Sequence, residues 1–174
     1  GSGDNSFGQL GLPSSISKVN VLTKIPLNSK FKVVKVSAGD TTSAIIVQDS
    51  ILNKKVLLAC GNNSFGSLGQ SLPKNNIFGF QIILERNNTN NALNFANSDN
   101  LLDVSTNEFI TAIIDNRKIW VSGKHKYISN DSNEIGFIGL NVQQNPDLSL
   151  LANMNPFKIE VGYFTQGIVP QSDG

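Results

Sequence analysis

The residues that could do chemistry are few in this chain. It contains one histidine, His125, and one cysteine, Cys60, which lie far apart in the sequence. A metal site needs several His, Cys or carboxylate ligands close together, so this pair predicts no metal site. A nucleophilic cysteine needs a base beside it, whereas Cys60 ends an apolar run, which favours an unreactive core position. We expect neither a metal ion nor another cofactor.

The carboxylates show no pairing suited to acid–base catalysis. General acid–base chemistry needs groups within hydrogen-bond reach of one reacting atom. The register of the sequence repeat brings together no two of the candidates, which are Glu85, Asp99, Asp103, Glu108 and Asp115. The chain is therefore predicted not to be an enzyme, and an active site hidden in a divergent fold is the least favoured hypothesis.

Two polar segments could instead contact a partner. The first is a loop that follows a strand and holds Lys124, His125, Lys126 and Tyr127. The second, residues 85–100, is rich in asparagine and too polar to order itself by burying a core, so we expect an excursion from the sheet. Its apolar anchors would be Leu93 and Phe95. The alternatives are a solvated loop and a low-complexity insertion, neither with a partner.

Composition excludes several classes of partner. The chain has 174 residues, of which 39% are hydrophobic and 16% charged, as expected for a globular domain with its own core. Its net charge is +1 and its basic residues are scattered, so neither nucleic acid nor a membrane is indicated. A single cysteine fits a reducing compartment, the cytoplasm or nucleus. The start without Met and the abrupt end predict a piece of a longer protein.

A ten-residue stretch occurs twice. "GDNSFGQLGL" (Gly3–Leu12) recurs as "GNNSFGSLGQ" (Gly61–Gln70). A degenerate third copy follows Gly123, with residues 135–139 aligned to residues 65–69. Self-similarity at a fixed period predicts a repeat architecture, here with approximate units 3–60, 61–122 and 123–174. The repeated structural glycines are Gly8, Gly11, Gly66, Gly69, Gly136 and Gly139.

Alternating apolar runs recur in phase with these glycines. Runs rich in Val, Ile and Thr, broken by short turn-forming patches, predict hairpins over residues 33–47, 101–115 and 157–169. Third strands are expected at 54–61 and 117–123, and weaker fourth strands at 19–25 and 78–84. Four antiparallel strands in about 60 residues form a β-propeller blade. The sequence predicts an all-β partial propeller of about three blades over residues 1–174.

The repeated glycines then have a structural role. We expect them to adopt backbone angles closed to other residues, so that the chain crosses tightly from one blade to the next. Leu10 and Leu68 would be buried between blades. A phosphate-binding loop is disfavoured because no Lys-Ser/Thr pair follows and no helix begins there.

These motifs resemble the repeats of the regulator of chromosome condensation family, which forms seven-bladed propellers. The family pattern runs through an Asn, a Gly-Gln-Leu-Gly core, a Pro and an Ala-Gly turn. Here "GDNSFGQLGL" precedes Pro13, "GNNSFGSLGQ" is followed by Pro73, and "VSAGDTTSAII" matches the Ala-Gly strand pair. The resemblance is strong over the first 70 residues and faint after residue 123.

The chain departs from the family pattern at two kinds of position. The tryptophan before the repeat glycine is replaced by Cys60 and Ser122. The histidine after the Ala-Gly turn is replaced by Thr42, Ile110 and Thr165. The blades are therefore divergent. About three blades do not close a seven-bladed ring, so remaining blades or a second copy are expected to cover the exposed strand edges.

The resemblance implies a non-catalytic protein–protein interaction scaffold whose loops contact another protein. The alternative that it implies is a guanine-nucleotide exchange factor for a Ran-like small GTPase, which opens the nucleotide site without covalent chemistry. The absence of a basic face mildly disfavours a chromatin-docked exchange factor.

Overall fold

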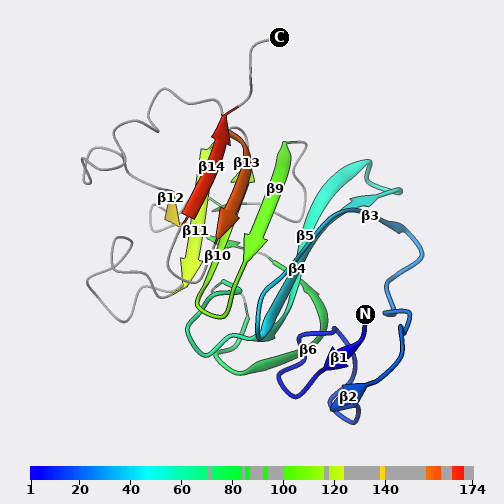
Figure 1. Cartoon of the computed structure of the whole chain (residues 1–174). Coiled ribbons are helices and arrows are strands. Elements are labelled where there is room, and N and C mark those ends of the chain that lie inside the picture. Colours follow the sequence, from blue (N-terminus) through cyan, green and yellow to red (C-terminus); the bar gives the residue numbers. More distant parts are fainter. Residues whose placement is uncertain are drawn as a thin grey trace.

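The computed structural model describes residues 1–69, 72–83, 85–86, 92–93, 100–115, 118–123, 138–139, 156–161 and 166–170. All helix or strand structure in these residues is β-strand, which confirms the predicted all-β fold. The same residues contain no helix that is long and apolar enough to cross a membrane. Two four-stranded sheets form the centre of the molecule (Figure 1).

The first sheet has the strand order β3 (Phe31–Ala38), β4 (Thr42–Asp49), β5 (Lys54–Asn62) and β6 (Asn76–Ile82), all antiparallel. Its middle strands are apolar on both faces. Ile45, Val47, Val56 and Leu58 lie buried on one face, and Ala44, Ile46, Leu57 and Ala59 on the other. A strand buried on both faces needs near-continuous apolar sequence, which "SAIIV" and "VLLAC" provide.

The second sheet repeats this order with β9 (Leu101–Thr106), β10 (Ile110–Asp115), β11 (Lys118–Gly123) and the short β12 (Ile138–Gly139). The corresponding registers match. Thr42 pairs with Gly61 in the first sheet, and Ile110 pairs with Gly123 in the second. Gly139, expected in the third glycine loop, instead lies in β12 opposite Trp120.

Three two-stranded sheets complete the described structure. β1 (Gly3–Asp4) pairs with β2 (Lys18–Val19), and β13 (Pro156–Val161) pairs with β14 (Gln166–Pro170). Of the strand expected at 19–25, only Val19 lies in a strand, and residues 20–25 form no strand. Within the segment 85–100, where an excursion from the sheet is expected, β7 (Glu85–Arg86) and β8 (Ala92–Leu93) pair with each other in a sheet of their own.

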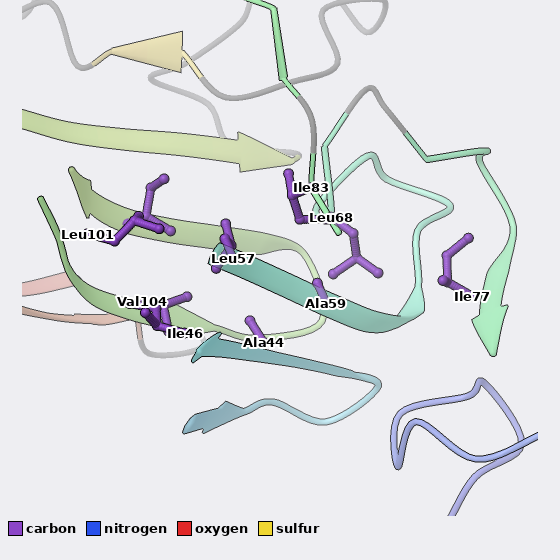
Figure 2. Close-up of a cluster of buried hydrophobic side chains, with 10 residues drawn as sticks. Ala44, Ile46, Leu57, Ala59, Leu68, Ile77, Ile83, Leu101 and Val104 are labelled. Atoms are coloured by element: carbon purple, nitrogen blue, oxygen red, sulfur yellow. The ribbon is translucent and has the colours of Figure 1, made fainter. Parts of the chain in front are cut away.

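The main core lies between the two four-stranded sheets. Figure 2 shows Ala44, Ile46 and Leu57 of the first sheet gathered with Leu101 and Val104 of the second. Ile113 completes the second sheet's side of this cluster, and Trp120 packs against it. A second cluster joins the second sheet to β13 through Ile159, which packs with Ile110, Ala112, Ile114 and Val121. Successive sheets are thus packed face to face, as propeller blades are.

The glycine loops connect the third and fourth strands of a sheet. Residues 63–75 leave β5 and return as β6 of the same sheet, so the expected crossing between blades is wrong. The loop still fills the space between sheets, because fully buried Leu68 belongs to the main core. Leu10, expected to be buried, is only half-buried. The sequence units 3–60 and 61–122 each begin near the end of a third strand, at the equivalent residues Gly3 and Gly61.

Glycine is needed where the third strand ends. Gly3, Gly61 and Gly123 occupy the same position of the repeat, with φ of 114°, 112° and 111°, a range that side chains rarely adopt. The glycines inside the loops also have positive φ, as expected: 86° at Gly8, 69° at Gly11, 70° at Gly66 and 95° at Gly69.

Replacing Gly61 by alanine adds both backbone strain and a steric overlap, whereas replacing Gly3 adds backbone strain alone. A Cβ at Gly61 would lie 2.2 Å from the Thr41 carbonyl oxygen, whereas a Cβ at Gly3 meets nothing within 4 Å. Gly61→Ala should lower the free energy of unfolding by about 2–5 kcal/mol, from strain and overlap together. Gly3→Ala should lower it by about 1–2 kcal/mol, from strain alone. Urea denaturation measures both values, and equal losses would contradict this account.

Candidate functional site

The first strands of successive sheets, β3, β9 and β13, lie side by side without pairing through their backbones. Each has an open edge, so its outward amide groups need acceptors from elsewhere. Buried Asp103 on β9 supplies one of them. Its Oδ2 accepts a hydrogen bond of 2.8 Å from the Ile159 amide of β13, and its Oδ1 lies 2.8 Å from the Lys35 Nζ of β3. One carboxylate therefore joins three sheets.

Two serine hydroxyls repeat the same connection. Ser37 Oγ accepts a hydrogen bond of 3.0 Å from the Thr106 amide, and Ser105 Oγ accepts one of 2.9 Å from the Val161 amide. Ser37 and Ser105 are equivalent in the repeat, as are Thr106 and Val161. Each first strand thus gives a side-chain acceptor to the edge of the next.

Buried threonines continue this network at the turn between the first two strands of each sheet. Thr42 Oγ1 lies 2.9 Å from Thr106 Oγ1 and donates to the Asn107 carbonyl at 2.7 Å. Thr106 Oγ1 also lies 2.7 Å from Thr111 Oγ1. Thr42 stands where the family pattern has histidine, and its hydroxyl links the two sheets there.

The three first strands line an open hollow of about 320 Å³. Its charged side chains are engaged with one another. Lys35 pairs with Asp103, and Lys158 pairs with Glu160 at 2.5 Å. The hydrogen bond between Lys158 and Glu160 raises the pKa of the lysine and lowers the pKa of the carboxyl. The first pair joins β3 to β9, whereas the second lies within β13.

The cysteine is not placed to react as a nucleophile. Cys60 is fully buried, its Sγ lies 3.7 Å from the Gln9 carbonyl oxygen, and burial raises the thiol pKa to about 12. No group of three or more His, Cys, Asp or Glu side chains within the described part of the chain is placed to hold a metal ion. Asp103 serves the contact between sheets.

Both described glycine loops are held rigidly and rest on the following sheet. Buried Asn5 and Asn63 occupy equivalent positions, and their Oδ1 atoms accept the amides of Leu10 at 3.0 Å and Leu68 at 2.8 Å. Ser43 donates to the Gln9 carbonyl at 2.7 Å, joining the first loop to the first sheet. In the same way, Ser122 donates to the Gly66 carbonyl at 2.5 Å, joining the second loop to the second sheet.

These loops present aromatic rings. Phe7 and Phe65 are equivalent in the repeat, and each is 37% exposed. The Phe65 ring lies 5.1 Å, centroid to centroid, from the ring of Phe109 on the β9–β10 turn. We call Phe7, Phe65 and Phe109 the loop aromatics.

The partner-binding residues predicted from the sequence are not among the loop aromatics. Lys124, His125, Lys126, Tyr127, Phe95 and the repeat glycine Gly136 are outside the described residues, and the backbone of Leu93 lies in β8. Sequence reasoning missed Asp103, Ser37 and Ser105 as joining residues. The available signal was the shared Val-Ser pair of "KVSAG" and "DVSTN", which recurs at one position of the repeat.

Removing the shared carboxylate should weaken the whole assembly of sheets. Asp103→Ala leaves the Lys35 ammonium and the Ile159 amide without their acceptor, so we expect the free energy of unfolding to fall by about 2–4 kcal/mol. Asp40→Ala removes the same charge from an exposed turn and should change it by about 0.5 kcal/mol or less. Urea denaturation compares the two variants, and similar losses would refute the joining role.

The buried thiol should resist modification. At pH 8 Cys60 should react with a thiol reagent such as dithionitrobenzoate only when the chain unfolds, because the thiolate is scarce and enclosed. Ser64→Cys places a thiol on the exposed part of a glycine loop and should react at once in the folded protein. Rapid reaction of native Cys60 would contradict its place in the core.

Comparison with known proteins finds both a family repeat and similar solved structures. Residues 1–46 match the family model of the regulator of chromosome condensation (RCC1) repeat. A comparison with curated proteins finds no significant match.

Three solved structures share the fold. Yeast RCC1 (Prp20) bound to Kap60 superposes with a TM-score of 0.68 at 16% identity, over 99% of this chain and 38% of that one. Prp20p of Saccharomyces cerevisiae, described with its binding to Gsp1p and histones, gives 0.68 at 16% identity over 99% and 40%. Human WBSCR16 gives 0.60 at 17% identity over 91% and 37%.

The chain spans about two fifths of the length of these proteins. The superpositions show a shared fold, and the repeat match supports the same assignment at the N-terminal end. The chain therefore carries a divergent RCC1 repeat and folds as part of an RCC1-type β-propeller.

Proposed function

We propose that this protein is a non-catalytic protein–protein interaction scaffold of the RCC1 propeller type. The observation that carries the proposal is the repeated presentation of Phe7 and Phe65. Each ring projects from a glycine loop that is fixed by a buried asparagine and docked on the next sheet. The two rings therefore stand at the same place on consecutive repeats.

Exposed aromatic rings on rigid loops are suited to binding. Aromatic side chains are enriched among the residues that dominate protein interfaces. A loop that is already ordered loses little conformational entropy when a partner arrives, so more of the contact energy appears as affinity. The ring of Phe109, packed against Phe65, extends this surface toward the second sheet.

The chemistry of the described residues supports a non-catalytic role. Cys60 is enclosed, and the charged groups of the hollow are paired with one another. The partner in this proposal is another protein, met in the cytoplasm or nucleus. The similar yeast protein, RCC1 (Prp20), is described with protein partners: Kap60 in one structure, and Gsp1p and histones in the other.

One alternative function has a specific observation in its favour. A protein of this fold, Prp20p, is described by its binding to Gsp1p as well as to histones. Together with the RCC1 repeat at residues 1–46, this supports a guanine-nucleotide exchange factor for a Ran-like small GTPase. Such a protein would deform a nucleotide site through surface contacts and form no covalent intermediate.

Binding measurements test the scaffold. Gsp1p, core histones and Kap60 serve as probes against the immobilised chain. We expect a stable complex with at least one of them, and the double variant Phe7→Ala/Phe65→Ala should weaken it by about tenfold or more, because the interface loses two apolar anchors. Leu22→Ala, a truncation at an 88% exposed position outside the glycine loops, is the control and should bind normally.

Nucleotide release separates the two functions. Gsp1p loaded with fluorescent GDP is mixed with the chain, and the loss of fluorescence is followed over time. A scaffold leaves the release rate unchanged while the complex forms. Release that accelerates with the concentration of the chain would support the exchange factor, and binding that survives the double variant would exclude the loop aromatics as the contact surface.

A further inference from the structure

The turn between β4 and β5 is longer than its counterpart in the second sheet. Four residues separate the last paired residues of these strands, Asp49 and Lys54, whereas two residues separate β10 from β11. The longer turn contains Ile51 and Leu52, which we call the turn pair, and the sequence of the shorter turn is polar. The second sheet forms without an apolar pair at this place, so a sheet of this kind does not require one.

The turn pair is held in a fixed position. The buried Asp49 carboxylate accepts the Ile51 amide at 2.9 Å and the Leu52 amide at 3.1 Å, both through Oδ1. Its Oδ2 lies 2.8 Å from the Nζ of Lys30, the residue before β3. Asn53 then turns the chain with a φ of 52°, which asparagine adopts more readily than most residues. A carboxylate inside the fold therefore orders the backbone that carries two apolar side chains.

The turn pair is exposed although it is apolar. Ile51 is 76% exposed and Leu52 is 54% exposed, and neither belongs to a hydrophobic cluster of the described core. Single aliphatic residues on a surface are ordinary, whereas contiguous apolar surface marks places of interaction. The turn pair is therefore placed to contact another molecule.

Positive charge lies close to this turn. Lys32 of β3 and Lys55 of β5 pair with the same residue of β4, one row of the sheet inside the turn. Lys55 donates to the Leu101 carbonyl at 2.8 Å, a neutral acceptor that fixes its position and leaves its charge in place. Because the Asp49 carboxylate already pairs with Lys30, the other two lysines make this end of the first sheet positive. These lysines are scattered in the sequence, and the register of the sheet brings them together.

The turn lies at the opposite end of the first sheet from the second glycine loop. β4 runs from Thr42, which pairs with Gly61 near the start of that loop, to Asp49, which pairs with Lys54 at the turn. Figure 1 shows the β4–β5 hairpin extending away from the side on which β1 and β6 lie. The turn pair is therefore a surface separate from the loop aromatics.

A membrane and a protein are the two kinds of surface that such a turn could meet. A single myristoyl chain, which is longer than the two side chains of the turn pair together, binds a membrane only marginally. A protein surface adds shape complementarity, and a rigid turn profits from it because little conformational entropy is lost on binding. The observations therefore favour a protein.

We propose that the β4–β5 turn is a second protein-binding surface and takes an acidic segment of its partner, in which Asp or Glu flanks an aliphatic or aromatic residue. The apolar residue packs on Ile51 and Leu52, and the acidic residues pair with Lys32 and Lys55. The apolar contact supplies affinity, while the charges speed and orient the encounter. This inference goes beyond the proposed function, because it concerns a surface that the loop aromatics do not share.

Selection from a peptide library tests this surface. Random peptides displayed on phage are selected on the immobilised full chain, and those that bind the Ile51→Ser/Leu52→Ser variant equally well are removed. We expect the retained peptides to combine Asp or Glu with Leu, Phe or Trp and to bind that variant about tenfold or more weakly. Leu22→Ser changes an 88% exposed leucine elsewhere and should bind them normally. Circular dichroism checks that both variants fold.

Charge reversal tests the lysine contact. Lys32→Glu should weaken binding of the retained peptides by about fivefold or more, because a peptide carboxylate then meets a like charge. Lys18→Glu makes the same change at an exposed position on β2 and should leave binding within about twofold. Added salt should weaken binding to the unaltered chain, since it screens the attraction.

Three results would overturn the proposal. The first is a selection in which no peptide is retained. The second is retained peptides without acidic residues, or equal effects of Lys32→Glu and Lys18→Glu, either of which would leave an apolar contact alone. The third is binding to vesicles of equimolar phosphatidylcholine and phosphatidylserine that the Ile51→Ser/Leu52→Ser change abolishes, which would assign the turn pair to a membrane. None of these outcomes involves Gsp1p, histones or Kap60, so the proposed function is tested separately.

Discussion

The open edge of each first strand is the constraint on which the rest of this structure depends. Sheets packed face to face cannot pair their first strands through backbone hydrogen bonds, so the outward amides need other acceptors. Asp103, Ser37 and Ser105 supply them from the preceding strand. Because these groups are short and buried or half-buried, they fix the spacing of successive sheets, and the aliphatic clusters between the sheets can then pack closely.

The same spacing determines where the loops can act. A glycine loop leaves one sheet, turns through residues with positive φ, and rests on the next sheet through a serine hydroxyl. If the sheets could slide, the loops would move with them and their aromatic rings would not keep a fixed relation. The rigid junction between first strands therefore supports the surface that carries Phe7 and Phe65, although the two lie in different parts of the fold.

Much of this fold could be predicted from local pattern. Period-two alternation located the hairpins, and the repeated glycines indicated backbone angles that the structure shows at Gly8, Gly11, Gly66 and Gly69. The contacts between sheets could not be predicted in the same way. Asp103 lies in a strand that alternation describes well, but its partners Lys35 and Ile159 are separated from it by 68 and 56 residues. Only the packing of blades brings these residues together.

The position of the glycine loop shows that the most prominent motif of a sequence repeat does not have to mark the start of a blade. The sequence period begins most clearly at the glycines, which invited the interpretation that a blade begins there as well. The hydrogen-bonded unit instead begins at Phe31 and at Leu101, about half a period away. Backbone hydrogen bonds determine which strands form a sheet, whereas a sequence repeat is recognised by the residue types that recur most clearly. Here the prominent residues lie between the third and fourth strands, so each sequence unit joins the end of one blade to the start of the next.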